Sequence, residues 1–260
     1  MISEINAMSI YSAITSADSL KAYQQNFEKL SSGSKLNRAS DGAAEIAISN
    51  LLKADLASVD QGIRNVRDGV SMLQIADSSL ETVSKNLTRM KELTTQAGSD
   101  LYSPEQKKLI QQEFDQLAAQ NTQIGQTTTF NGIRLHANNQ TISITADGEQ
   151  AAEIQSKAIP QVSANVSDFK TTISSLDQII EYINAYRADL GSHINTLQVS
   201  ADSLNHKAEE ILKSESRISD TDVAATAAAL ASSEIIAEQA MASQAQANTS
   251  IKATSTLLQK

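Results

Sequence analysis

Cysteine and tryptophan are absent from this 260-residue chain, proline occurs twice, glycine occurs nine times, and aromatic residues make up only 3%. The absence of cysteine excludes disulfides, thiol nucleophiles and metal sites built from thiolates. A chain with few prolines, glycines and aromatics, yet 40% hydrophobic residues, is typical of long helices with an aliphatic core rather than of an ordinary globule.

Basic residues are outnumbered, with 21 Lys and Arg against 30 Asp and Glu, and the net charge is −9. We therefore expect no nucleic-acid partner, because binding to phosphates requires clustered positive charge. No run of apolar residues is long enough to span a bilayer, so we expect no membrane partner. Residues 1–20 lack the basic and apolar regions of a cleaved secretory signal, so any export would use a route that reads no such signal.

Two stretches of the chain carry apolar residues at steps of three and four, from Ile48 to Met90 and from Phe169 to Ile211. This spacing places each set on one face of a helix. Each stretch would extend about 65 Å at the usual rise per residue, which is far longer than an average globular helix. We predict a mainly α fold: an elongated antiparallel bundle of long helices, a coiled-coil-like rod, with a small β-hairpin element in the middle and helices at both termini.

Breaks in the periodic pattern divide the chain into five expected parts. They are an N-terminal helix with its linking loop (1–41), N-terminal core helices (42–133), a short β and loop middle (134–165), a C-terminal core helix (166–217) and a C-terminal Ala-rich helix (218–260).

Local signals place several turns and helix ends. Ser103, Pro104 and Gln106 have the pattern of a capped helix start. The pair Asn131-Gly132 predicts a tight turn just before the middle segment, and Asp147-Gly148 predicts a second turn within it. Asp220, just before the Ala-rich run, is expected to cap the last helix.

Glycine also occurs inside the first long helix, at Gly62 and Gly69, off the apolar stripe. Each destabilises a helix by about 1 kcal/mol relative to alanine. Either the stripe overrides this penalty, or a neighbouring segment approaches the helix closely at these positions.

The two ends of the chain carry little charge. Residues 1–32 hold five charged groups, residues 220–260 hold six, and 11 of the 25 residues from Val223 to Ala247 are alanine. Helical ends that are poor in charge are candidates for burial against other copies of the chain.

Catalytic and metal-binding patterns find little support. The histidines His136, His193 and His206 are scattered, and His206 is expected to face solvent. The glycines do not have the spacing of a phosphate-binding loop. Asp220 and Asp222 could form a carboxylate pair, but a helix cap is the better interpretation. We expect no catalytic residue, no metal site, no cofactor and no enzymatic activity.

Several blocks of sequence, in order along the chain, resemble bacterial flagellin. They cover residues 30–44 (Leu-Ser-Ser-Gly-Ser-Lys-Leu-Asn-Arg-Ala-Ser-Asp-Gly-Ala-Ala), 87–97, 127–132, 216–222 and 239–248. The chain departs from the family at Asp41-Gly42, where two adjacent Asp are common, and at Thr88, where Gln is usual. Its middle segment is also short, so it resembles a flagellin with little or no outer domain.

The resemblance implies a structural subunit that is secreted and polymerises into the extracellular flagellar filament for motility. Its terminal helices would form the inner tubes of the filament, and its core helices would surround them. The implied partners are further copies of the chain, the flagellar export chaperone, and the cap and hook-associated proteins.

Arg89, Leu93 and Glu113 match family positions that contact the vertebrate flagellin receptor, so they are candidate contacts with an innate receptor. The alternative interpretation is that Arg89 is a solvated charge and Leu93 a minor packing residue.

Three alternatives to a filament subunit make different predictions. A hook–filament junction protein shares related terminal helices, but it would form a short collar rather than a long tube. A free-standing coiled-coil adaptor would have helical termini that are stable in the monomer. An enzymatic insert on a flagellin scaffold would need a larger middle segment than this chain has.

Overall fold

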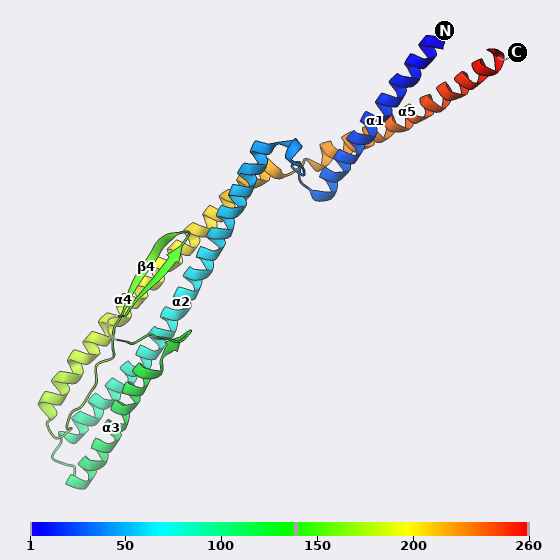
Figure 1. The fold of residues 1–260 in the computed structure, drawn as a ribbon. Helices are drawn as coiled ribbons and strands as arrows, with labels where there is room; N and C mark the ends of the chain where they lie inside the picture. Colours follow the sequence, from blue (N-terminus) through cyan, green and yellow to red (C-terminus); the bar gives the residue numbers. More distant parts are fainter. Residues whose placement is uncertain (1, 138–139, 259–260) are drawn as a thin grey trace. The chain divides into compact units, whose positions relative to one another are not determined.

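The computed structural model describes residues 2–137 and 140–258, and most of them are helical (Figure 1). The helices are α1 (Ile2–Ser32), the short 3-10 helix η1 (Ala39–Asp41), α2 (Ala43–Ala97), α3 (Pro104–Thr127), α4 (Phe169–Ser219) and α5 (Val223–Leu258). The strands are β1 (Thr129–Phe130), β2 (Ile133–Arg134), β3 (Gln140–Ala146) and β4 (Glu149–Ser156). The predicted mainly α fold, with long helices, a small β element in the middle and terminal helices, is confirmed.

The chain forms two compact units. Residues 56–209 form one unit, which we call the core unit, and residues 1–55 together with 210–260 form the other, which we call the terminal unit. The long helices α2 and α4 contribute residues to both units.

The core unit is held together by aliphatic side chains from α2, α3 and α4. Leu80 and Leu87 of α2, Phe114 of α3, and Leu176 and Leu190 of α4 are all less than 2% exposed. Most of the two predicted stripes is buried in this way, because steps of three and four keep these side chains on the face that meets the neighbouring helix.

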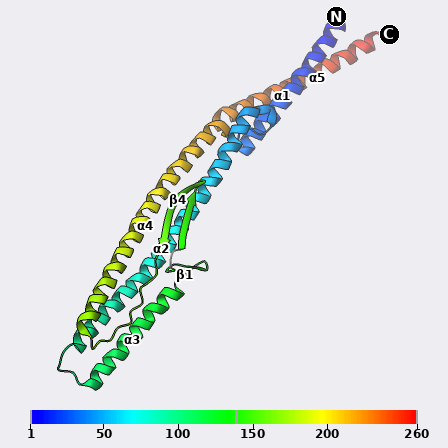
Figure 2. The same cartoon turned by 60° about the vertical axis from the view of Figure 1, so that its left-hand side comes forward.

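Ion pairs across the core unit show how α2 and α4 run. Asp77 pairs with Arg187 at 2.8 Å, and Lys91 pairs with Asp177 at 2.6 Å. As residue numbers rise along α2, those of the partners on α4 fall, so the two helices are antiparallel as predicted. Figure 2 shows them side by side, with α3 and the strands on the same unit.

Both predicted turns are present in two antiparallel hairpins. Asn131 and Gly132, with φ of 47° and 79°, join β1 to β2, and Asp147 and Gly148, with φ of 52° and 79°, join β3 to β4. Positive φ at both central residues is the geometry of a type I′ turn, which suits Asn, Asp and Gly.

The β3–β4 hairpin lies against α2 at its two interior glycines. A Cβ on Gly62 would come within 2.8 Å of the backbone nitrogen of Asp147, and a Cβ on Gly69 would collide with the side chain of Ile144. Close approach of a neighbour, one of the two explanations offered by the sequence, therefore accounts for both glycines.

Helix ends agree with the sequence at α3 and differ at α5. The Ser103 hydroxyl accepts from the Gln106 amide at 3.3 Å, and the Gln106 side chain accepts from the Ser103 amide at 2.9 Å. For α5 the prediction of an Asp220 cap is wrong, because Asp222 accepts from the Ala225 amide at 3.0 Å. Asp220 instead accepts a hydrogen bond from Ser216 of α4.

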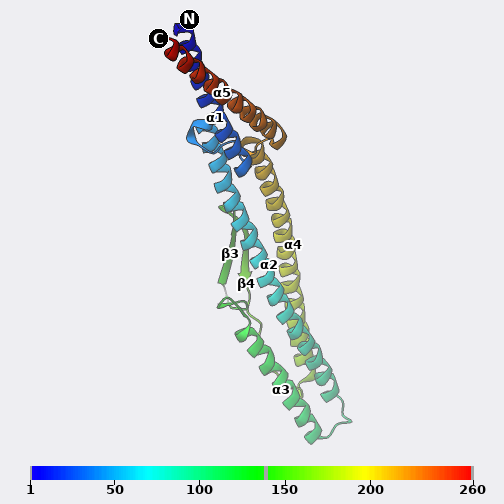
Figure 3. The same cartoon turned by 90° about the vertical axis from the view of Figure 1, so that its right-hand side faces the viewer.

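The terminal unit contains α1 packed against α5, which run side by side in Figure 3. Among the residues whose burial the structure describes, those buried in this pair are small: Ser16 and Ser19 on α1, and Ser233, Ala237 and Ala240 on α5. Small side chains let the two helix axes approach closely but bury little apolar area.

Backbone hydrogen bonds join the segment that follows α1 to the end of α4 and the residues after it. The Lys35 amide donates to the Ser219 carbonyl at 2.8 Å, and the Thr221 amide donates to the Gly33 carbonyl at 3.0 Å. Gly33 has a φ of 71°, which a residue with a Cβ adopts only with strain. These bonds connect the N-terminal part of the terminal unit (1–55) to its C-terminal part (210–260).

Candidate assembly surface

The exposed face of α1 carries large apolar side chains. Ile10, Tyr11 and Ile14 are 61%, 74% and 56% exposed, respectively. At about 100° per residue they lie on the side of the helix away from Ser16 and Ser19, which are buried against α5. This outward apolar face has no cover among the residues that the structure describes.

Helix α5 is apolar on more than one face. Ala237 and Ala240 are buried, whereas Ile235, Ile236 and Met241 are 55%, 43% and 49% exposed. The whole helix has three charged residues in its 36 positions, Glu234, Glu238 and Lys252. A helix with few charges and apolar residues on more than one face is a candidate for burial against a neighbour.

The exposed large apolar residues are concentrated in the terminal unit. Of the described residues in this class, twelve belong to the terminal unit and five to the core unit. The twelve are Ile10, Tyr11, Ile14, Leu20, Phe27, Ile48, Leu51, Leu212, Val223, Ile235, Ile236 and Met241. Ile48, which was predicted as part of the buried stripe, is thus 49% exposed. A concentration of this kind marks an interaction surface.

The loop after α1 is fixed by charge and hydrogen bonds. The Asp41 carboxylate accepts from the backbone amides of Asn37 at 3.0 Å and Arg38 at 2.8 Å. The hydrogen bond from Arg38 is the main reason why the pKa of Asp41 lies below its usual value. Arg38 also pairs with Glu28 of α1 at 2.6 Å. The loop is therefore an ordered connection.

The three predicted receptor contacts separate into two kinds. Arg89 and Glu113 meet on the surface, where Arg89 Nε lies 3.0 Å from Glu113 Oε1, and their side chains are 49% and 47% exposed. This hydrogen bond with Glu113 raises the pKa of Arg89. Leu93 is 1% exposed and lies in the core. Glu92, which the sequence did not single out, is a second partner of Arg89, at 3.2 Å.

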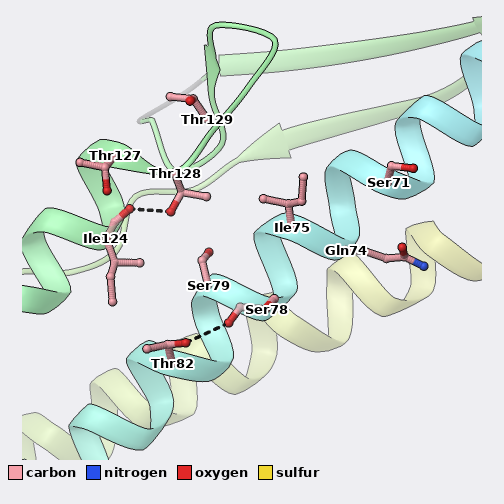
Figure 4. A pocket seen from close by; sticks show the side chains of 10 residues that line it. All are labelled: Ser71, Gln74, Ile75, Ser78, Ser79, Thr82, Ile124, Thr127, Thr128 and Thr129. Atoms are coloured by element: carbon pink, nitrogen blue, oxygen red, sulfur yellow. Dashed lines mark hydrogen bonds between the residues drawn. The ribbon is translucent and has the colours of Figure 1, made fainter.

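A groove of about 680 Å³ runs between α2 and the end of α3 (Figure 4). Its lining consists of Ser71, Gln74, Ile75, Ser78, Ser79, Thr82, Ile124, Thr127, Thr128 and Thr129. The hydroxyls mostly donate to backbone carbonyls three or four residues earlier, as Thr82 does to Ser78 at 3.2 Å and Thr128 does to Ile124 at 2.7 Å. Among the described residues, no charged side chain lines the groove.

The histidines lie in three different environments. His206 is exposed, as predicted, and His193 is partly exposed. His136 is 4% exposed and lies 2.6 Å from the Ser79 hydroxyl. Within residues 2–137 and 140–258, no three or more His, Asp or Glu side chains form a group that could bind a metal ion.

None of the helices in the described part of the chain combines the length and apolarity that crossing a bilayer requires.

Long helices and a concentration of exposed apolar residues in the terminal unit are the main features of the described residues. Two sequence models identify the class: the bacterial flagellin N-terminal helical region matches residues 3–141, and the bacterial flagellin C-terminal helical region matches residues 173–258. The chain therefore belongs to the bacterial flagellin family, a family of structural proteins, and only residues 142–172 separate the two matched regions.

Individual relatives agree with this assignment. The flagellar filament 33 kDa core protein of Treponema phagedenis is 30% identical over 251 residues, which cover 86% of this chain and 88% of the relative. The flagellar filament 31.3 kDa core protein of Treponema maltophilum is 29% identical across the whole of both chains. The crystal structure of Bacillus cereus flagellin matches with a TM-score of 0.50 and 27% identity, covering 54% of this chain and 88% of that chain.

Proposed function

We propose that this chain is a structural subunit of the bacterial flagellar filament and that it polymerises with further copies through its terminal unit. Family membership and the names of the filament core proteins support a filament subunit. The observation that carries the assembly surface is the large apolar residues on α1 and α5 that α1–α5 packing leaves exposed. The same relatives favour a filament subunit over the hook–filament junction protein.

The two terminal helices present different surfaces, and this difference suits an open polymer. A contact between α1 of one copy and α5 of the next joins two unlike patches, which leaves a free patch at each end for further growth. Burying one exposed Ile or Met side chain contributes about 1.5–3 kcal/mol. Association also loses an estimated 4–15 kcal/mol of translational and rotational freedom. Several side chains must therefore be buried per copy, and the terminal unit has twelve candidates.

The remaining partners follow from the same surface. We propose that the chain is secreted, works in the extracellular filament and has no enzymatic activity. A chain with this much exposed apolar surface requires cover before assembly, which is the role expected of an export chaperone. Cap and hook-associated proteins would contact the same terminal helices at the two ends of the polymer.

Receptor recognition is a second proposal, and it rests on the exposed pair of Arg89 and Glu113. Both side chains are accessible, whereas Leu93 would act only by supporting α2 from the core. Replacement of Arg89 by Ala should weaken receptor binding, and replacement of the exposed Lys85 on the same helix should not. Equal loss in both variants, measured with purified receptor ectodomain, would show that general charge rather than this pair matters.

Electron microscopy of purified protein tests the main proposal. The full chain should form long tubes, and a variant that lacks residues 220–260 should form none while keeping the helical signal of the core unit. Filaments formed by the shortened variant would show that α5 is not required for assembly. Short collars from the full chain would favour the hook–filament junction protein.

A further inference from the structure

A buried polar cluster lies where the two hairpins meet the long helices of the core unit. Its centre is His136, between β2 and β3, which is 4% exposed. The Nε2 atom of His136 lies 2.6 Å from the hydroxyl of Ser79 on α2. The imidazole also meets the ring of Tyr186 on α4 edge to face, with the ring centres 6.0 Å apart. One side chain therefore contacts both long helices.

The hydrogen bonds of the cluster assign the proton on the imidazole. The Ser79 hydroxyl donates its single hydrogen to the Ala76 carbonyl at 2.7 Å. Ser79 must then accept at its oxygen, so the hydrogen of the neutral imidazole is on Nε2. The Nδ1 atom has the lone pair, and it is buried with no hydrogen-bond partner among the described residues.

The same cluster attaches the chain on either side of the β3–β4 hairpin. The Ser156 hydroxyl at the end of β4 lies 2.7 Å from the Leu135 carbonyl and 2.9 Å from the Ala137 carbonyl. The Lys157 amide donates to the Tyr186 hydroxyl at 3.1 Å. The ends of the hairpin are therefore tied to each other and to α4 at the place where His136 contacts α2.

The charged groups around the cluster are already paired with one another. On α4, Asp189 pairs with Lys157 at 2.8 Å, and the Lys157 ammonium lies 5.4 Å from the centre of the Tyr186 ring. Asp77 of α2 pairs with Arg187 of α4. No carboxylate of the described residues forms a hydrogen bond with His136, so an imidazolium at this position would be a buried charge without a counter-ion.

We propose that His136 is an acid-sensitive latch: a proton added to Nδ1 releases the segment around residues 135–137, with the ends of the β3–β4 hairpin, from α2 and α4. The added N–H finds no acceptor among residues 2–137 and 140–258, and burial penalises the charge. Release into water removes both penalties, so protonation and opening are coupled.

The direction of the effect follows from the pKa of His136, which burial lowers from 6.5 to about 4. The open form takes up the proton first, because its histidine has the ordinary pKa. The closed form is therefore fully favoured above pH 6.5, and its advantage is lost as the pH falls from 6.5 to about 4. The opening equilibrium should rise roughly 100-fold across this range and little below it.

Hydrogen exchange, measured by NMR between pH 7 and pH 4 on the full chain, tests the latch. Three proteins are compared: the wild type, His136→Gln, which stays neutral and can still donate to Ser79, and His206→Gln, which replaces an exposed histidine. After correction for the intrinsic rate, opening at residues 128–137 and 140–157 should increase in the wild type and in His206→Gln. It should stay nearly constant in His136→Gln. Carboxylates titrate in all three proteins, so their effect cancels in the comparison.

A direct titration of the His136 ring signals in the wild type completes the test and does not depend on any variant folding. The latch predicts that the ring titrates well below pH 6.5, near the pH at which the rise in opening levels off. The proposal is overturned if His136 titrates near its ordinary pKa, if His136→Gln opens as the wild type does, or if the whole core unit opens together. It is equally overturned if the ring titrates and the segment stays closed.

Discussion

The core unit and the terminal unit are both built from long helices, but they differ in which side chains they bury. In the core unit, large side chains such as Leu80, Phe114 and Leu176 are completely buried. In the described part of the terminal helix pair, the buried side chains are Ser and Ala, and large ones such as Ile10 and Phe27 are more than half exposed. The core unit buries its large apolar side chains within one copy of the chain, whereas the terminal unit exposes many of its own, where another copy could cover them.

This difference follows from geometry as much as from composition. The core unit places a third helix and two hairpins beside α2 and α4, so a side chain such as Phe114 is enclosed from several sides. A helix pair encloses only the narrow strip between its two axes, so most of each helix stays exposed. Exposed apolar residues on such a pair are a property of a subunit before assembly, and they would be a defect in a monomer.

The largest expected effect contrasts one substitution in the two units. Phe114→Ala should lower the free energy of unfolding of the core unit by about 3–5 kcal/mol, because it removes a buried ring and leaves a cavity. Phe27→Ala, at a ring that is 56% exposed, should change the free energy of unfolding of the terminal unit by less than about 0.5 kcal/mol. Denaturant unfolding followed by circular dichroism measures both. Similar losses would mean that Phe27 is already packed in the monomer and that the contrast between the units is wrong.

The second prediction concerns assembly. The double change Ile10→Ser and Ile14→Ser should raise the concentration needed for filament growth by roughly 100-fold, since it removes two apolar side chains from the proposed contact. Thermal unfolding of the core unit should not change. Val199→Ser, at a position of the core unit that is 69% exposed, is the matched control. Sedimentation of filaments across a concentration series gives the answer, and normal growth of the double variant would remove α1 from the interface.

Much of this contrast can be predicted from sequence, because it depends on local patterns. The steps of three and four predict the helices and the buried face of the core unit. Asn131-Gly132 and Asp147-Gly148 predict the two turns, since their backbone conformation favours these residues. Low charge predicts that the terminal helices have apolar surfaces to bury.

The sequence alone was insufficient wherever the outcome depended on contacts between distant segments. His136 is buried because two hairpins bring it against Ser79 and Tyr186, and none of these neighbours is close to it in the chain. Ile48 continues the apolar stripe, yet it belongs to the terminal unit and is exposed. The burial of Leu93 could have been predicted locally, because Leu93 follows the stripe residue Met90 by three residues and so lies on the same helix face.

The third prediction uses two helical glycines of the core unit. Gly69→Ala should lower stability by about 1–2 kcal/mol, because overpacking against Ile144 outweighs the gain in helix propensity. Gly191→Ala, on α4 with open space around it, should instead raise stability by up to about 1 kcal/mol. Thermal unfolding of the two variants should therefore shift in opposite directions. A gain at both positions would mean that the hairpin moves away from α2 easily.

The smallest expected effect decides which aspartate begins α5. Asp222→Ala should weaken the first turn of α5 by about 1 kcal/mol, because its carboxylate accepts from the Ala225 amide at 3.0 Å. Asp220→Ala should leave that turn unchanged, since Asp220 accepts from Ser216 at the end of α4. Hydrogen exchange at the Ala225 amide separates the two variants: faster exchange is expected only in Asp222→Ala. The reverse result would restore Asp220 as the cap and would place the beginning of the terminal helix two residues earlier.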